Sequence, residues 1–347
     1  MIVQNRKVRG GIAAVINGYR NSQLEEDFNV LYVETYKDGN KVIKLLKSLL
    51  GYIHFFKVLL VNKPDLVHVH SSFGPSFYRK MPIIRLAKLF KIPIINHIHG
   101  ADFDSFYVNA SSKKQRIIKK YYNMCTVLIA LSKEWEENLK KVVPSEKIHV
   151  VENYSFINEE AVKSRTRNNG ERRVLFLGEI GRRKGCYDIP YIIKKVIDKL
   201  PNTRFVLGGV GEIDEIKTLL KKLNVLENVE FPGWVRGEVK DQLLQSSDLF
   251  FLPSYNEGMP MAILDAMGYG LPIVSTNVGG IPKIVISGKN GMIENPGNIE
   301  GLANGIIEIL QDTTKIKSFG DESYKIVKEK YSLESHIQSI KNLYLSH

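Results

Sequence analysis

The sequence predicts an α/β protein with two doubly wound domains, and three observations support this fold class. Apolar runs of four to seven residues, rich in Val and Ile and bounded by Gly, Pro, Asn or Asp, recur along the chain. Longer segments with helical periodicity separate them, which is typical of βαβ units whose parallel strands are covered on both faces. The chain has 347 residues, 44% of them apolar, which suffices for two hydrophobic cores.

The strands are expected where the short apolar runs fall. In the first half they are residues 28–33, 65–70, 92–98, 127–131 and 148–151, after a short opening strand that ends before Gly10. In the second half they are residues 174–178, 204–208, 229–231, 249–252, 272–275 and 292–293. Each run has the length and the composition of a buried parallel strand.

The boundary between the two domains is expected near residue 165. Residues 158–173 are charged and lack an apolar period, as a linker does. We therefore expect a Rossmann-like domain at residues 1–160 and a second one at residues 171–330. A closing helix within residues 331–347 can pack on either domain, the first included. Sheets of this kind bind ligands at the carboxyl ends of their strands, so two of them predict a cleft between the domains.

The positive charge of the chain lies in its first half. Residues 1–150 contain 24 Lys and Arg against 12 Asp and Glu, whereas the remainder contains 25 of each, which accounts for the net charge of +12. This asymmetry predicts an anionic partner for the first half, either an acidic lipid surface or a phosphorylated substrate. Nucleic acid is disfavoured because no zinc-finger spacing, aromatic RNA-binding signature or basic helical fork accompanies the charge.

One helical segment, residues 41–62, carries both apolar residues at helical spacing and four lysines, Lys41, Lys44, Lys47 and Lys57. It predicts either an interfacial helix that lies on anionic lipid or an ordinary covering helix with lysines at its margins.

The composition predicts a folded protein, and we expect it in the cytosol. If the basic first half binds lipid, we expect the protein at the inner face of the cell membrane. Cys125 and Cys186 cannot form a disulfide framework and have no metal-ligand spacing with the histidines, which fits a reducing compartment. No cofactor is expected. The first residues lack the apolar run of a signal peptide, and no apolar run is long enough to cross a bilayer.

Three features of the first half are candidates for binding or catalysis. Gly10 and Gly11 precede a predicted helix, where backbone N–H groups can approach a phosphate, although a tight turn explains the pair equally. His99 follows a strand and either faces the cleft or is a structural histidine. Asp102 and Asp104 could hold a divalent cation, but a capping or turn role is favoured because they follow a glycine turn.

The second half contains cations and carboxylates in loops that follow strands. Arg182, Arg183 and Lys184 suit a pyrophosphate, unless they only face solvent. Glu257 lies in the loop before a helix that starts near Pro260, and Asp265 lies about a turn and a half along that helix. The two carboxylates can therefore accept hydrogen bonds from separate hydroxyls of one ligand, the alternative being that Glu257 only caps the helix.

The motifs together resemble those of a known family. Residues 257–274 read Glu-Gly-x-Pro-x4-Asp-Ala-Met-x-x-Gly-x-Pro-x-Val, and the runs Val-Gly-Gly-Ile-Pro at 278–282 and Gly-x-Asn-Gly at 288–291 follow. This block is similar to the donor-binding signature of family 4 of the retaining glycosyltransferases, the glycosyl transferases group 1. The likeness extends back through the glycine motifs at 209–211, 178–185 and 10–11. The resemblance implies the two-domain GT-B fold, a nucleotide-sugar donor, retention at the anomeric carbon and no metal.

The resemblance assigns the donor sugar to the motif block. Glu257 and the backbone of Gly258 and Met259 would hold the sugar hydroxyls, and Asp265 would hold the ribose. The family usually has Glu where this chain has the shorter Asp265. Together with Glu179, described below, this departure leaves an alternative function open. The chain would then be a catalytically weak relative that acts as a binding or assembly partner.

The resemblance also assigns the diphosphate and the base. Arg183 and Lys184 would neutralise the pyrophosphate as charge builds on the leaving group, and Trp234 and Val235 would border the base. Glu179 stands where the family usually has Arg, so Arg183 and Lys184 must supply the cations.

In the first domain the resemblance implies that His99 contacts the sugar near its 6-hydroxyl and that Gly11 approaches the phosphate or the acceptor. The leaving phosphate or Asp102 would accept the acceptor's proton. The expected activity is sugar transfer to a saccharide, lipid-linked in cell-surface polysaccharide synthesis. A nucleotide-sugar epimerase of the same fold is a further alternative, disfavoured because the block around Glu257 matches transferases.

Overall fold

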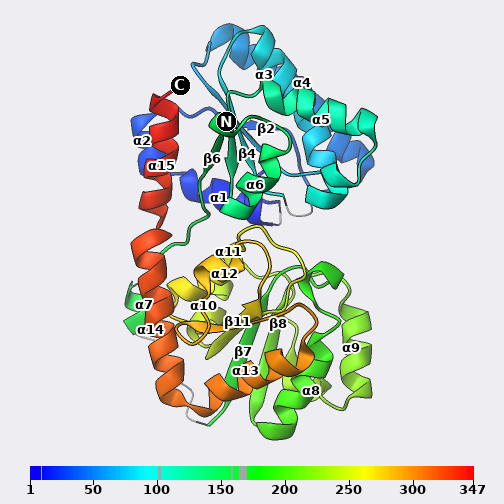
Figure 1. Ribbon diagram of the computed structural model, residues 1–347, viewed down its shortest axis with the longest axis vertical. Helices are drawn as coiled ribbons and strands as arrows, with labels where there is room; N and C mark the ends of the chain where they lie inside the picture. Colours follow the sequence, from blue (N-terminus) through cyan, green and yellow to red (C-terminus); the bar gives the residue numbers. More distant parts are fainter. Residues whose placement is uncertain (9, 101–102, 158, 164–169) are drawn as a thin grey trace. The chain divides into compact units, whose positions relative to one another are not determined.

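The structure, a computed structural model, describes residues 1–8, 10–100, 103–157, 159–163 and 170–347 (Figure 1). It divides into two compact units. Unit 1 comprises Met1–Asn153 and Leu333–His347, and unit 2 comprises Tyr154–Ser332. The candidate Asp102 and residues 158 and 164–169 of the predicted linker lie outside the described residues. In the described part of that linker, residues 159–163 form the short helix α7 (Glu159–Lys163), and Glu159 pairs with Lys328 at 2.5 Å.

The sheet of unit 1 is entirely parallel. Its strands, in the described residues, are β1 (Ile2–Val3), β2 (Val33–Glu34), β3 (Val67–Ser71), β4 (Ile94–Ile98), β5 (Val127–Ala130) and β6 (Ile148–Val150). They are arranged in the order β2-β1-β3-β4-β5-β6. The short opening strand and four of the five predicted strands are confirmed.

The predicted strand at 28–33 is wrong except for its last residue. Phe28 ends a helix, and the ladder with β1 starts only at Val33. The apolar side chains of this run serve packing instead, since Phe28 contacts Tyr344 edge to face and Tyr32 lies under the Arg20 guanidinium.

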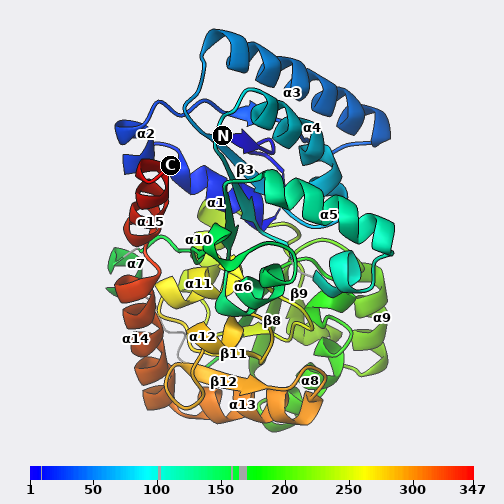
Figure 2. The same cartoon turned by 45° about the horizontal axis from the view of Figure 1, so that its top comes forward.

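The helices of unit 1 cover its sheet. They are α1 (Gly11–Tyr19), α2 (Gln23–Asp27), α3 (Lys41–Val61), α4 (Pro75–Leu89), α5 (Ser112–Met124), α6 (Lys133–Lys140) and α15 (Leu333–Leu345), with the short turns η1 (Asp104–Val108) and η2 (Ser145–Lys147). The C-terminal helix α15 belongs to this unit and lies beside α2, where Lys341 pairs with Asp27 (Figures 1 and 2). Helix α4 lies between α5 and the predicted lysine-rich helix α3 (Figure 2).

The sheet of unit 2 is also parallel and has a reversal in its strand order. The described strands are β7 (Arg172–Leu177), β8 (Thr203–Gly208), β9 (Val229–Glu230), β10 (Leu249–Leu252), β11 (Ile273–Thr276) and β12 (Gly291–Glu294), in the order β12-β11-β10-β7-β8-β9. All six predicted strands are confirmed. The chain runs outward from β7 to β9 and then returns to β10 on the other side, so the switch point lies between β7 and β10, where doubly wound sheets bind ligands.

The connections of unit 2 are helical. They are η3 (Arg182–Lys184), α8 (Ile189–Lys199), α9 (Ile213–Lys222), η4 (Leu226–Asn228), α10 (Glu238–Gln245), α11 (Met261–Gly268), α12 (Ile281–Ile284), α13 (Ile299–Gln311) and α14 (Thr313–Lys330). Helix α11 begins directly after Pro260, as predicted. Over the described part of the chain, no helix of either unit has both the length and the apolar character of a bilayer span.

Candidate active site

An ion pair with a buried carboxylate lies at the switch point of unit 2. The Lys184 Nζ lies 2.5 Å from Glu257 Oε1, and the Ser254 hydroxyl donates to the same oxygen at 2.6 Å. Lys184 comes from the loop after β7 and Glu257 from the loop after β10, so each strand of the switch point contributes one charge. Glu257 is only 6% exposed. We call Arg183, Lys184 and Glu257 the switch-point cluster.

Arg183 completes this cluster. Its Nη1 lies 3.6 Å from Glu257 Oε2 and donates to the backbone carbonyl of Asn256 at 3.1 Å. Its Nη2 lies 3.7 Å from the exposed carboxylate of Glu179. Two cations thus face one buried carboxylate, and the interpretation of Glu257 as a helix cap is wrong because α11 has Pro260 at its N-cap without a side-chain bond.

The two loops approach closely because Gly185 has no side chain. Gly185 has φ +71°, and a Cβ there would lie 1.9 Å from the carbonyl oxygen of Pro253. Next to this contact the Tyr255 N–H donates to the carbonyl of Arg183 at 2.9 Å. The glycine therefore sets how near Lys184 comes to Glu257.

Two further glycines fix the other side of Glu257. The N–H of Gly280 donates to the carbonyl of Gly258 at 2.6 Å, and a Cβ on Gly279 would lie 2.0 Å from the Glu257 carbonyl oxygen. The Met259 side chain is buried and contacts Gly280. The loop after β11 thus holds the loop after β10 at Glu257, Gly258 and Met259, three residues that the family resemblance assigns to the donor sugar.

The loop after β8 packs against the loop after β7 in the same way. A Cβ on Gly209 would lie 1.8 Å from the carbonyl oxygen of Gly178, and Gly211 has φ +139° beside the Ile180 carbonyl. The half-buried Trp234 and Val235 follow β9, and a Cβ on Gly208 would lie 3.1 Å from the Val235 side chain. The glycines at 208–211 are therefore explained by the close packing of the two loops, which leaves no room for side chains at Gly209 and Gly211.

The second carboxylate, Asp265, has partners that the sequence did not indicate. Its Oδ1 accepts from the Ser155 hydroxyl at 3.0 Å, and its Oδ2 lies 3.0 Å from Lys240 Nζ. The charge of Asp265 raises the pKa of Lys240. Ser155 and Lys240 are far from Asp265 in sequence, and no motif marks them.

The candidates of unit 1 lie where β1 and β4 end. Gly11 is the exposed first residue of α1, after β1. His99 follows β4, its N–H donates to the Ser71 carbonyl at 2.8 Å, and its Nε2 lies 2.9 Å from the Nδ1 of His70. Burial of the ring lowers the pKa of His99 to about 3, so its imidazole is neutral at pH 7. Asp104 opens the turn η1, and its partner Asp102 lies outside the described residues.

His99 is the end of a histidine group that the sequence analysis missed. His68, His70 and His97 lie beside it on β3 and β4. A signal existed, since His-x-His occurs twice, at 68–70 and 97–99, on two predicted neighbouring strands.

Two protein-family models match the chain in sequence. The model "Glycosyltransferase Family 4" matches residues 15–154, and the model "Glycosyl transferases group 1" matches residues 157–326. Together they cover most of both units.

Several curated proteins are similar over most of their length. An uncharacterized glycosyltransferase of Methanocaldococcus jannaschii is 28% identical over 83% of this chain and 76% of its own. An Escherichia coli UDP-Gal:alpha-D-GlcNAc-diphosphoundecaprenol alpha-1,3-galactosyltransferase is 27% identical over 95% of this chain and 87% of its own. A 41.2 kDa protein of the Klebsiella pneumoniae cps region is 26% identical over 88% of each.

Solved structures share the fold at low sequence identity. Anabaena HepE, solved in complex with UDP and glucose, has a TM-score of 0.77 and 20% identity, over 100% of this chain and 98% of its own. The lipopolysaccharide outer core galactosyltransferase WaaB has a TM-score of 0.68 and 18% identity, over 99% of this chain and 98% of its own.

Proposed function

This chain belongs to the group 1, family 4 glycosyltransferases with the GT-B fold, and from that premise we propose that it transfers a hexose, with retention, from a nucleoside diphosphate sugar to a saccharide acceptor. The family supports transfer from a nucleotide-sugar. The observation that carries the proposal is the pair of Lys184 and Glu257 at the switch point of unit 2.

A nucleoside diphosphate sugar suits the switch-point cluster because it brings both an anion and hydroxyls. Its diphosphate replaces the carboxylate as the partner of Lys184 and Arg183. Its sugar hydroxyls donate to Glu257, so the buried carboxylate keeps hydrogen-bond partners when the cations turn away. In the free protein the ion pair keeps both charges compensated.

The transfer step follows from these contacts. The bond between the anomeric carbon and the leaving phosphate oxygen breaks, and the acceptor oxygen bonds to the same face of that carbon. The acceptor's proton passes to the leaving phosphate, or to Asp102 in the alternative that we retain. Arg183 and Lys184 stabilise the charge that develops on the phosphate, so we propose a reaction without a metal requirement. Asp265 is assigned to the ribose, and Trp234 and Val235 to the base. His99 is assigned to the sugar near its 6-hydroxyl, and Gly11 to the phosphate or the acceptor.

We propose a lipid-linked acceptor in cell-surface polysaccharide synthesis, reached at an anionic membrane surface through α3. Ten large apolar side chains of α3 are exposed, among them Leu50 at 63% and Ile53 at 68%. The helix has four lysines and no acidic residue. An exposed apolar face flanked by lysines suits an anionic lipid surface. The Escherichia coli relative is named for a diphosphoundecaprenol substrate, which supports such an acceptor.

The catalytic proposal is tested with purified protein and a panel of nucleotide-sugars. A true donor should raise the melting temperature, and it should be consumed when lipid-linked saccharides are added. Glu257→Ala should lower kcat/KM about 100-fold, whereas Glu308→Gln, an exposed ion-pair residue of α13, should not. Tight donor binding without turnover would favour the binding-partner alternative, and an epimer formed without acceptor would favour the epimerase.

The membrane proposal is tested by flotation with vesicles of phosphatidylcholine alone or mixed with phosphatidylglycerol. The protein should float with the mixed vesicles, and the double variant Leu50→Gln/Ile53→Gln should remain at the bottom. Leu89→Gln removes an equally exposed apolar side chain from α4 and should leave flotation unchanged. Equal flotation of wild type and the double variant would refute a role for α3.

A further inference from the structure

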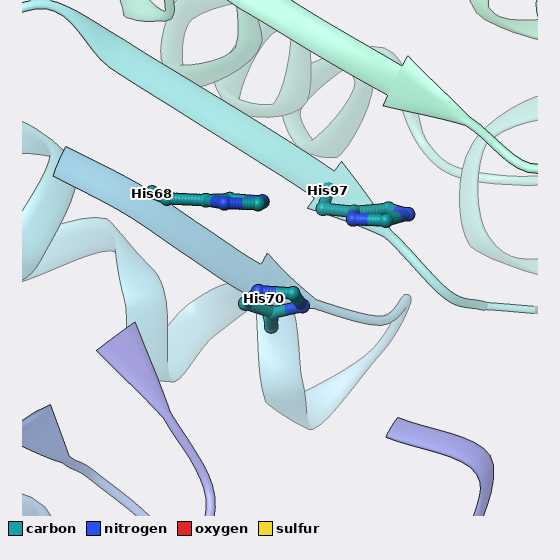
Figure 3. Close-up of side chains that lie close together, drawn as sticks. All are labelled: His68, His70 and His97. Atoms are coloured by element: carbon teal, nitrogen blue, oxygen red, sulfur yellow. The ribbon is translucent and has the colours of Figure 1, made fainter. Parts of the chain in front are cut away.

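Three buried histidines lie together on one face of the unit 1 sheet (Figure 3). His68 and His70 are two residues apart on β3 and point to the same face, and His97 of β4 stands opposite His70. One nitrogen of each ring lies within 4.8 Å of those of the other two. The side chains are 1%, 2% and 0% exposed. The sheet therefore gathers three imidazoles away from water.

Each ring of β3 has one nitrogen held and one free. The Nδ1 of His68 lies 2.6 Å from the Tyr344 hydroxyl, and the Nδ1 of His70 lies 2.9 Å from His99 Nε2. The Nε2 atoms of both rings and both nitrogens of His97 are buried without a hydrogen-bond partner in the described residues. An unsatisfied buried polar atom costs about 1–3 kcal/mol. One nitrogen held by a neighbour while the other remains free is how metal-binding histidines are oriented.

The charge state of the cluster also suits a metal. Burial lowers the pKa of His68, His70 and His97 well below the usual value, so all three rings are neutral at pH 7. The neutral imidazole is the form that binds metal. Imidazole nitrogens select ions of the Zn²⁺ type, whereas Mg²⁺ and Ca²⁺ prefer oxygen ligands.

A cavity at the amino-terminal ends of β1 and β3 reaches one histidine of the cluster, His68. It has a volume of about 320 Å³, and His68, Tyr344, Met1 and Asp65 are among the residues that line it. It gives an ion an approach to His68.

We propose that His68, His70 and His97 bind one divalent transition-metal ion, with Zn²⁺ as the expected occupant and solvent as the fourth ligand. Zn²⁺ binds imidazole nitrogen at about 2.0–2.1 Å, so the three rings must draw together. His97 is free to turn, because neither of its nitrogens is held in the described residues. The rings of His68 and His70 are stacked, with centroids 4.3 Å apart, and must tilt so that both aim a nitrogen at the ion. The ion would tie β3 to β4 and, through Tyr344, to α15. This site belongs to unit 1 alone and does not depend on the proposed transfer reaction.

The test uses the full-length chain without a histidine tag, stripped with chelator and dialysed. Co²⁺ serves as the spectroscopic probe and should produce visible d–d absorption that saturates at one equivalent. Zn²⁺ should abolish that absorption and raise the melting temperature of the stripped protein by about 5 °C. Absence of Co²⁺ absorption in the stripped wild type would overturn the proposal.

Two variants and a control separate ligation from packing. His97→Phe keeps an aromatic ring in the cluster and should abolish Co²⁺ absorption. Tyr344→Phe removes only the hydroxyl that orients His68 and should weaken Co²⁺ binding about 10-fold, a readout available even if His97→Phe does not fold. His149→Gln changes an exposed histidine on β6 and should bind as wild type. Unchanged Co²⁺ affinity in both variants would refute ligation by the cluster.

Discussion

The two units stabilise a lysine of low exposure in different ways. In unit 2, Lys184 pairs with Glu257 at 2.5 Å in a loop at the carboxyl end of the sheet. In unit 1, Lys80 of α4 is 3% exposed and donates to the Thr35 hydroxyl at 2.5 Å, and no carboxylate of the described residues lies within ion-pair distance. Burial and the neighbouring Arg79 lower the pKa of Lys80 to about 7.

We interpret this difference as one between a charge kept for the proposed anionic donor and a charge that burial disfavours. A paired lysine can exchange its carboxylate for an anionic substrate. An unpaired buried lysine relieves its desolvation by losing its proton. The comparison predicts opposite effects when each lysine becomes Met, which has a similar volume but no charge.

Lys184→Met should have the largest effect. It leaves the buried Glu257 with Arg183 at 3.6 Å as its remaining cation, so unfolding free energy should fall by about 3 kcal/mol. Transfer should fall about 100-fold because the diphosphate loses a cation. Urea unfolding and steady-state kinetics measure both, with Lys195→Met in an exposed pair with Glu300 as the control. An unchanged free energy of unfolding would mean that Lys184 is not required to stabilise the buried Glu257 carboxylate.

Lys80→Met should stabilise the protein at pH 7. The folded pKa of about 7 lies below the unfolded value of about 10.4, so the unfolded chain binds the proton more tightly between these values. Lys80 therefore destabilises at pH 7, and this cost disappears as the pH rises to about 10. After loss of the Thr35 bond, we expect a gain of about 2 kcal/mol at pH 7 that diminishes towards pH 10.

The measurement is urea unfolding of wild type and Lys80→Met at pH 7, 8.5 and 10. Lys88→Met, exposed on the same helix, should show no such pH-dependent difference. A constant difference between wild type and Lys80→Met at all three pH values would show that Lys80 does not titrate in this range.

Gly279→Ala tests whether backbone contacts hold the paired charges of unit 2. Its Cβ would lie 2.0 Å from the Glu257 carbonyl oxygen, so the loop must move in addition to the strain at φ +56°. We expect a loss of about 2 kcal/mol and weaker donor binding. Gly288→Ala has φ +79° but nothing within 4 Å of its Cβ, and should lose about 1 kcal/mol with donor binding unchanged. Equal behaviour of the two variants would show that strain alone matters.

Sequence periodicity predicted the strands well, because parallel strands buried on both faces form continuous apolar runs. It failed at 28–33, where an apolar run packs against α15 and is not paired before Val33. The glycine and carboxylate motifs predicted which loops carry the switch-point cluster, since each motif follows a strand. The pairing of Lys184 with Glu257 depends on the order of β7 and β10, which periodicity does not contain.

The partners of Asp265 were beyond sequence reasoning for the same reason. Ser155, in the segment after β6, is 110 residues away and Lys240 of α10 is 25 residues away, and only the folded chain brings their side chains to one carboxylate of α11. The pair of Lys240 and Asp265 resembles that of Lys184 and Glu257, because in both a carboxylate assigned to the donor is paired with a lysine.

Lys240→Met should have the smallest effect of the four variants. Asp265 keeps its hydrogen bond from Ser155 but is free to rotate about it, so a ribose hydroxyl should be held less firmly. We expect KM for the donor to rise about 10-fold, with kcat within about threefold of wild type, because an interaction made equally in the ground and transition states is lost. Lys194→Met, in an exposed pair with Asp198, is the matched control. A fall in kcat at constant KM would contradict the assignment of Asp265 to the ribose and would indicate that it acts near the reacting carbon. The pairs Lys184–Glu257 and Lys240–Asp265 would then both act on the transfer step.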